Sequence, residues 1–213
     1  MSNRMDHTSF DICRRTTLAL LAGGEARRMG QAKALLHLHG TPILSYLHSR
    51  LSWPGPTLLV TAPGREHPPG TELFSAEVTD PIAGQGPLRG VLTALEAATT
   101  SHVVVMPVDM PNVTADALAW LVSRLIERPE APLAMVERTQ DGAPQIEPMP
   151  AAFNVVRALP LIRQQLESNH PALRDLAALA GAAIFPAPDF LPPDFWVNLN
   201  YPEDVKSFSR PTP

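Results

Sequence analysis

A short apolar strand followed by two glycines and a group of cations constrains this chain more than any other feature. Residues 18–22 form an unbroken apolar run, which is typical of a strand buried on both faces of a sheet. Gly23 and Gly24 end the run and let a ligand approach bare backbone amides. Arg28 and Lys33 follow closely. Because amide groups and cations together disperse the charge of a triphosphate, the stretch predicts a nucleotide site.

The first half of the chain alternates buried strands with amphipathic helices, which predicts the α/β class with a doubly wound, mainly parallel sheet. In such sheets ligands bind beyond the carboxyl ends of the strands. Gly23, Asp80 and Asp109 each follow an expected strand, so they should meet in one cleft. We expect further strands over 57–61, 72–78 and 102–109, and helices that begin at Thr41-Pro42, near Val91 and at Thr114.

The second half is less regular, and we expect it to add a small C-terminal elaboration to the same domain. A turn at Asp141-Gly142 should join two strands. The remaining expected elements are a helix over 155–166 that is interrupted or bent near Pro160, a short helix over 170–179, a strand over 182–185 and an ordered segment over 196–205.

The 213 residues suffice for one large α/β domain, which we place at 16–208. Residues 1–15 are expected to be a flexible tail with Cys13 as an inert or exposed thiol. The net charge of -4 gives no reason to expect nucleic acid or a membrane surface as a partner. Without a secretory signal or an apolar run of membrane-spanning length, a cytoplasmic protein is the default expectation.

Asp109, at the end of the clearest strand, is placed to hold Mg²⁺ opposite the glycine loop. Magnesium prefers one or two carboxylates together with waters and substrate phosphates. The plainer alternative is that Asp109 caps the following turn. Asp80 could likewise hold the nucleoside or only cap the loop at Pro81. Together these parts suit nucleotidyl transfer, in which Arg28, Lys33 and Mg²⁺ on Asp109 would neutralise the leaving pyrophosphate.

The stretch from Leu21 to Lys33 resembles the nucleotidyltransferase signature Leu-Ala-Gly-Gly-x-x-x-Arg-Met-Gly-x-x-Lys. Its Ala-Arg-Arg-Met-Gly form is similar to that of the molybdenum cofactor guanylyltransferases, the MobA family. Three later segments resemble the same family: Gly-Pro-Leu-Arg-Gly at 86–90, Pro-Val-Asp-Met-Pro at 107–111 and Asn-Leu-Asn-Tyr-Pro-Glu-Asp at 198–204.

The resemblance implies a Rossmann-like nucleotidyltransferase fold and transfer of GMP from GTP to a molybdopterin-type cofactor, with release of pyrophosphate. It implies a nucleotide-binding half over 16–128 and an acceptor-binding half over 129–208, with Asn198 and Asn200 near the acceptor. Molybdenum-insertion proteins or molybdoenzyme chaperones are the implied protein partners. The residues implied to bind GTP are Leu21, Ala22, Gly23, Gly24, Lys33, Asp80 and Asp109, with Asp109 on Mg²⁺.

Three departures from the family pattern keep other functions open. Ala32 stands where many members have Asp, and Thr61-Ala62 stands where an Asn-containing strand end often touches the base. The segment Ile146-Glu147-Pro148-Met149 replaces the usual His-Pro. The first two affect base selection and the third affects the acceptor. The alternatives are a nucleotidyltransferase that uses CTP or a sugar phosphate, and a nucleotide-binding regulator without catalysis. The presence of both Lys33 and Asp109 argues against the regulator.

Overall fold

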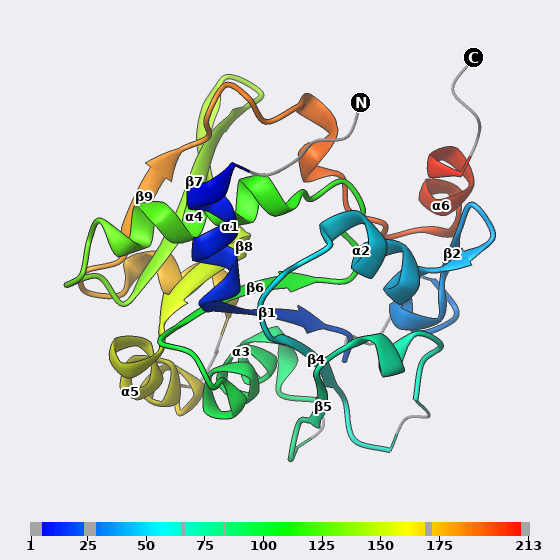
Figure 1. Cartoon of the computed structure of the whole chain (residues 1–213), viewed down its shortest axis with the longest axis horizontal. Coiled ribbons are helices and arrows are strands. Elements are labelled where there is room, and N and C mark those ends of the chain that lie inside the picture. The colour runs from blue at the N-terminus through cyan, green and yellow to red at the C-terminus, as the bar shows by residue number, and fades with distance from the viewer. Residues whose placement is uncertain (1–5, 24–28, 65–66, 83, 169–171, 210–213) are drawn as a thin grey trace.

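The computed structural model describes residues 6–23, 29–64, 67–82, 84–168 and 172–209. Within these ranges one sheet of seven strands crosses the molecule in the order β5-β4-β1-β6-β8-β7-β9 (Figure 1). All neighbours are parallel except β8, which runs antiparallel to both β6 and β7. The mainly parallel, doubly wound sheet is therefore confirmed. Its strands are β1 (Thr16–Leu21), β4 (Thr57–Thr61), β5 (Ala76–Thr79), β6 (His102–Pro107), β7 (Leu133–Gln140), β8 (Ala143–Asn154) and β9 (Ala183–Pro186).

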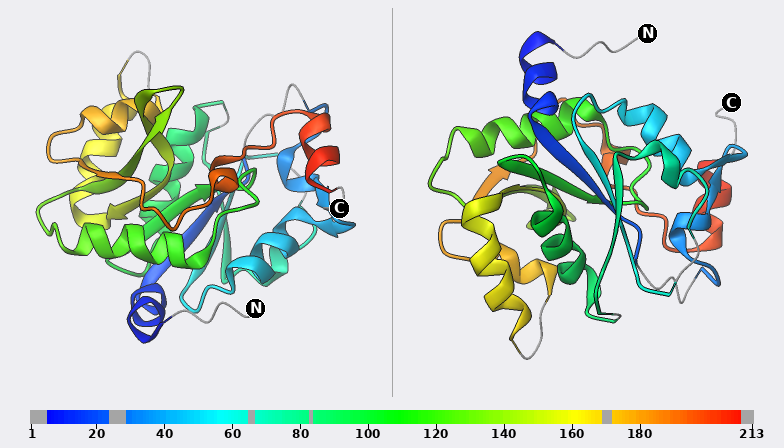
Figure 2. Two further views of the ribbon diagram at one scale, coloured as in Figure 1. Left: turned by 90° about the horizontal axis from the view of Figure 1, so that it is seen from above. Right: turned by 60° about the horizontal axis from the view of Figure 1, so that its bottom comes forward.

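Helices cover both faces of this sheet. α3 and α5 lie together on one face, and α1, α2 and α4 lie on the other (Figures 1 and 2). None of the helices in the described ranges is long and apolar enough to cross a membrane. The helices are α1 (His7–Arg14), α2 (Ile43–Leu51), α3 (Gly86–Ala97), α4 (Ala115–Ile126), α5 (Val155–Leu166) and α6 (Pro202–Phe208), with short 3-10 turns η1 (Lys33–Leu35), η2 (Thr71–Leu73), η3 (Leu173–Ala178) and η4 (Pro193–Trp196).

The core follows the apolar runs of the central strands. Leu18, Ala19 and Leu20 of β1 are buried on both faces, as the apolar run over 18–22 predicts. α3 approaches β1 closely at Gly90, where an added Cβ would lie 3.1 Å from a methyl carbon of Leu21. This contact holds the N-terminal part of α3, residues 86–90, beside the carboxyl end of β1. α3 therefore begins at Gly86, earlier than the start near Val91 that the sequence predicts.

The chain before β1 differs from expectation. Residues 7–14, expected as part of a flexible tail, form α1, whose side chains pack against α4. Asp6 caps this helix by accepting a hydrogen bond from the Ser9 amide. Cys13 is buried beneath it, and burial raises the pKa of its thiol to about 12. Cys13 is therefore an inert thiol and not an exposed one.

The start of α2 also differs. Thr41 and Pro42 form strand β3, which pairs with β2 (His37–Leu38), and the helix begins at Ile43 without a side-chain cap. Leu38 of β2 is fully buried and pairs with Thr41. This pairing holds Thr41 and Pro42 in an extended strand, so they do not form the first turn of the helix. α6, at the far end of the chain, lies beside the ribbon (Figure 1).

In the second half, β7 and β8 form a long hairpin whose turn is Asp141-Gly142, as predicted. Both turn residues have positive φ, 53° and 81°, which favours this residue pair in a two-residue hairpin. The strands are longer than expected, because the hairpin extends beyond the sheet. α5 continues through Pro160, so the interruption expected there is absent. The strand expected over 72–78 is shorter and starts at Ala76, after η2.

The later elements match expectation in part. A helix was expected over 170–179. Residues 172–179 form only the 3-10 turn η3, and residues 170 and 171 lie outside the described residues. β9 confirms the strand expected over 182–185. Strands of both halves of the chain join in one sheet, because β6 pairs with β8.

Candidate active site

A cleft of about 630 Å³ opens at the carboxyl ends of β1, β4, β5 and β6. Gly23, Asp80 and Asp109 all line it, so the predicted convergence of three strand ends is confirmed. Strand order explains why: β5, β4, β1 and β6 are adjacent and parallel, so the residues that follow them reach the same edge. Of the residues predicted for the site, those that line the cleft are Leu21, Gly23, Lys33, Asp80, Asp109 and Asn198.

The glycine loop begins one wall of this cleft. Ala22 does not line it, because Ala22 is buried and its amide donates to the Val60 carbonyl at 2.8 Å. Gly23 passes close to β4, and a Cβ there would lie 3.1 Å from the Ala62 amide nitrogen. A side chain at this position would therefore push against backbone. Gly24 and Arg28 lie outside the described residues.

Lys33 and Asp109 form an ion pair in the middle of the cleft. Lys33 lies on η1, and its Nζ donates to Oδ2 of Asp109 and, at 2.9 Å, to Oδ1 of Asn200. The side chains of Lys33 and Asp109 are 20% and 10% exposed. The Asp109 backbone is fixed as well, because its carbonyl accepts from the Leu199 amide at 2.9 Å. The C-terminal segment thus holds both members of the pair in place.

Oδ1 of Asp109 is buried and has no hydrogen-bond partner. An unpaired carboxylate oxygen costs free energy unless a ligand binds it. In the described residues no group of three His, Cys, Asp or Glu side chains could enclose a metal ion. A metal here would therefore depend on Asp109, water and substrate for its ligands, which is an arrangement that Mg²⁺ accepts.

Asp80 also has a carboxylate oxygen without a hydrogen-bond partner. Its backbone N–H donates to the Thr61 carbonyl, while its side-chain Oδ1 is buried without a partner. Burial raises the pKa of this carboxyl above its usual value, and the neighbouring Thr93 hydroxyl and Arg89 guanidinium lower the pKa in opposition. Asp80 therefore brings a carboxylate with one unpartnered oxygen to the wall of the cleft.

The wall beside Asp80 contains one departure from the family pattern, Thr61-Ala62. The Thr61 hydroxyl donates to Oε1 of Glu77 at 2.9 Å and does not line the cleft. Val60 of β4 and Ala62, which directly follows the strand, do line it, because alternate residues of an extended chain face opposite sides. The Thr61 side chain is thus turned away, and this part of the wall is apolar.

The two asparagines predicted for the acceptor are placed differently. Asn198 lines the cleft, with its Nδ2 bonded to the Trp196 carbonyl. Asn200 does not line it, and its side chain contacts Lys33 instead. The segment over 197–201 forms no strand. Asp204 begins α6 by accepting from the Asn200 and Tyr201 amides.

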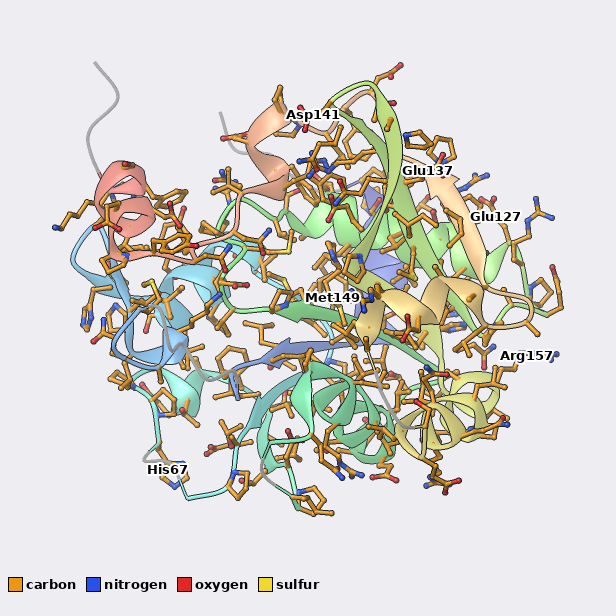
Figure 3. The ribbon with its side chains drawn as sticks, turned by 180° about the vertical axis from the view of Figure 1, so that it is seen from behind. His67, Glu127, Glu137, Asp141, Met149 and Arg157 are labelled. Carbon is orange, nitrogen blue, oxygen red and sulfur yellow. The ribbon has the colours of Figure 1, made fainter. Side chains whose placement is uncertain are left out.

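Sequence reasoning missed the wall opposite the glycine loop. This wall is formed by Glu147, Pro148, Met149 and Leu173. In the view from behind, Met149 lies near the middle of the molecule, whereas Asp141 lies at the end of the same hairpin (Figure 3). Glu147 was visible only as a departure from a motif. Nothing in the local pattern of β8 indicates which of its residues reach the cleft.

The comparisons with known proteins agree with this geometry. Residues 18–183 match the MobA-like NTP transferase domain. A molybdenum cofactor guanylyltransferase of Histophilus somni is 30% identical over 197 residues, which cover 90% of this chain and 94% of that protein. A molybdenum cofactor guanylyltransferase of Vibrio atlanticus is 29% identical over 196 residues, covering 91% and 95%.

Among solved structures, the molybdopterin-guanine dinucleotide biosynthesis protein A of Archaeoglobus fulgidus superposes with a TM-score of 0.66 and 23% identity, covering 91% of this chain and 96% of that one. This likeness confirms the expected nucleotidyltransferase fold. The match over residues 18–183 extends across both walls of the cleft and all of the strands that carry it. The chain belongs to the MobA-like NTP transferase domain family.

Proposed function

We propose that this enzyme transfers GMP from GTP to a molybdopterin-type acceptor and releases pyrophosphate. The observation that carries the proposal is the Lys33–Asp109 pair, which lies between a glycine-loop wall and a second wall in one cleft. A nucleotidyltransferase needs such an arrangement, because two anionic substrates must be held in line on either side of the reacting phosphorus. The relatives named molybdenum cofactor guanylyltransferase support GTP and the molybdopterin-type acceptor as the substrates.

In this proposal the triphosphate lies along Gly23 and Lys33. The bare amide of the glycine loop approaches phosphate oxygens, and Lys33 exchanges its bond to Asp109 for one to phosphate. Asn200 keeps the Lys33 ammonium group in place during this exchange, since it holds Nζ independently of Asp109. Arg28 is the further cation proposed for the leaving pyrophosphate.

Asp109 would hold Mg²⁺ through its buried, unpartnered Oδ1. When bound, the ion would neutralise charge on the phosphates as a Lewis acid. The acceptor is already an oxyanion, so the site has no need of a general base. The work of the protein is to orient the two substrates and to compensate their charges.

Base recognition is proposed for the wall formed by Asp80, Ala62 and Pro87. The apolar surfaces of Ala62 and Pro87 could receive a flat base, and Asp80 could accept hydrogen bonds from the nucleoside. Asn198 is proposed for the acceptor, because it lines the cleft next to Leu199, whose amide donates to the Asp109 carbonyl. Molybdenum-insertion proteins or molybdoenzyme chaperones remain the proposed recipients of the product.

The test is a panel of the four ribonucleoside triphosphates with Mg²⁺ and purified molybdopterin, followed by pyrophosphate release. GTP should support transfer, and omission of the acceptor should stop it. Transfer with CTP but not with GTP would reject the guanylyl assignment, and the protein would still be a nucleotidyltransferase. Transfer to a sugar phosphate and not to molybdopterin would reject the acceptor. Nucleotide binding without any transfer would indicate a regulator.

A further inference from the structure

Glu147 is a carboxylate in the cleft for which no role follows from the chemistry above. Its side chain is 13% exposed and lines the wall opposite the glycine loop. β8 runs antiparallel to β6 with Ala151 opposite Val105, so the residues before Ala151 continue past the carboxyl end of β6 toward Asp109. β4 and β5 lie on the other side of β6 in the sheet. Glu147 therefore belongs to the side of the cleft away from Asp80.

The position of Glu147 is fixed by Arg138 on the neighbouring strand. Nε of Arg138 donates to Oε1 of Glu147, and its NH2 group donates to Gln140 at 2.6 Å. The guanidinium also lies over the Trp196 ring, 5.5 Å from its centroid. Three partners thus immobilise Arg138, and Arg138 in turn holds one oxygen of Glu147.

The other oxygen of Glu147 is left to a ligand. Oε2 has no hydrogen-bond partner among the residues that the structure describes, and it is not among the buried atoms that lack one. A carboxylate oxygen in this position accepts N–H donors and repels phosphate. The adjoining wall is formed by Pro148, Met149 and Leu173, which offer apolar contact to a flat ring.

We infer that Glu147 binds the 2-amino-4-oxopyrimidine edge of the acceptor's pterin through its free oxygen. This edge presents a ring N–H and an exocyclic amino group side by side, and the free oxygen can accept from both. The inference rests on the proposed function, because it assigns part of the acceptor. It goes further by naming the group that is recognised and the residue that recognises it. The acceptor's phosphate would then point away from Glu147, toward Lys33 and Asp109.

Guanine carries the same edge, so the ligand of Glu147 could in principle be GTP. The sheet order favours the acceptor. Gly23, Ala62 and Asp80 follow β1, β4 and β5, whereas Glu147 lies on β8, beyond β6. With the α-phosphorus near Asp109, one substrate extends to each side, and only the acceptor extends toward β8.

The test compares steady-state kinetics of wild type and Glu147→Gln with GTP, Mg²⁺ and molybdopterin. Arg138 offers only donors, so the amide oxygen of the substituted side chain must face it and the amide NH₂ must face the ligand. Donor then opposes donor, and we expect the acceptor KM to rise roughly 10- to 100-fold while the KM for GTP changes less than about twofold. The matched control is Glu127→Gln, because Glu127 is likewise paired with one arginine, Arg124, but lies outside the cleft. It should leave both KM values unchanged.

An unchanged acceptor KM in a folded Glu147→Gln protein would overturn the inference, and a rise in the KM for GTP alone would assign Glu147 to guanine instead. If the wild type transfers no nucleotide to molybdopterin, the proposed function fails and a binding experiment decides the inference. Fluorescence titration with 6-hydroxymethylpterin and with 6-hydroxymethyllumazine, which has a carbonyl in place of the amino group, should show tighter binding of the pterin. Glu147→Gln should remove that preference. Equal binding of the two probes, or binding of neither, would overturn the inference.

Discussion

Substituting Asp109 with asparagine separates the proposed metal chemistry of the cleft from its stability. In the wild type, Oδ2 accepts from Lys33 and Oδ1 is buried without a partner. Asparagine keeps the shape and one acceptor oxygen, so Lys33 retains a hydrogen bond to it and to Asn200. What is lost is the negative charge, and with it the proposed Mg²⁺ ligand.

The expected magnitudes differ between the two properties. Replacing this charge-assisted hydrogen bond by a neutral one costs about 1 kcal/mol, because the Lys33 side chain is 20% exposed and keeps its bond to Asn200. For a chain of 213 residues this lowers Tm by roughly 2–4 °C. Loss of the metal ligand should remove about 4 kcal/mol of transition-state stabilisation, or about 1,000-fold in turnover.

The assay is pyrophosphate release at saturating GTP and acceptor, beside a thermal scan of each protein. Asp189→Asn is the control, since Asp189 is exposed and does not line the cleft. The Asp109→Asn protein should still bind GTP without metal at least as well as the wild type, because a negative charge near the triphosphate has been removed. Turnover within tenfold of the wild type in the folded variant would refute the assignment of Asp109 to the metal.

Three further outcomes are expected. Lys33→Ala should raise the KM for GTP and lower kcat, since the ammonium compensates charge in both the ground state and the transition state; unchanged values would mark Lys33 as a structural partner of Asp109 only. GTP with Mg²⁺ at about 100 times its Kd should stabilise the fold by about 2.7 kcal/mol, or roughly 5–10 °C in Tm, with a smaller shift from CTP; an equal shift from CTP would reject guanine selectivity. Asp80 has a pKa raised by burial, so the native state binds more protons than the unfolded state between pH 3.8 and the raised value, and its ionisation costs stability as pH rises through that window. Asp80→Asn should therefore raise Tm at pH 7 while weakening GTP binding, which thermal scans over pH and a GTP titration measure; a lower Tm would contradict this account.

The sequence predicts those parts of the fold that local chemistry determines. The apolar runs of β1, β4 and β6 predict strands that are buried on both faces, and the structure shows them buried. Thr114 caps α4, with its hydroxyl accepting from the Ala117 amide, as its position before an amphipathic stretch indicates. In these cases the residues that determine the structure are neighbours along the chain.

Elements determined by distant contacts were harder to predict. Thr41 and Pro42 read as a helix start, yet pairing with β2 and burial of Leu38 place them in a strand. Residues 7–14 read as a tail because their apolar residues are few, and α4 supplies the surface on which they fold. In both cases tertiary packing determines the secondary structure, and the local sequence preference does not.

The candidate site divides in the same way. The glycine loop and the two aspartates could be placed from sequence, since each follows a recognisable strand and parallel strands end at one edge. Glu147 could not, because its place depends on β8 being antiparallel and on a shift in its pairing with β7. Ala134 of β7 pairs with Ala152 of β8, but Val136, two residues further along β7, pairs with Glu147. The extra residues of β8 at this irregularity include Pro148 and Met149, which reach the cleft.

The Lys33–Asp109 pair also has a consequence for the order of binding events in the proposed reaction. In the free enzyme each charge neutralises the other, and Asn200 and Leu199 hold the two residues from the C-terminal segment. If GTP alone drew Lys33 away, Asp109 would be left buried without a counter-charge. If a cation alone bound Asp109, it would repel the ammonium group of Lys33. Each event alone therefore carries a penalty that the other removes, because the cation replaces Lys33 at Asp109 and the triphosphate replaces Asp109 at Lys33. The geometry consequently favours joint binding of nucleotide and metal over binding of either one, and the affinity for GTP should depend on Mg²⁺ through this pair.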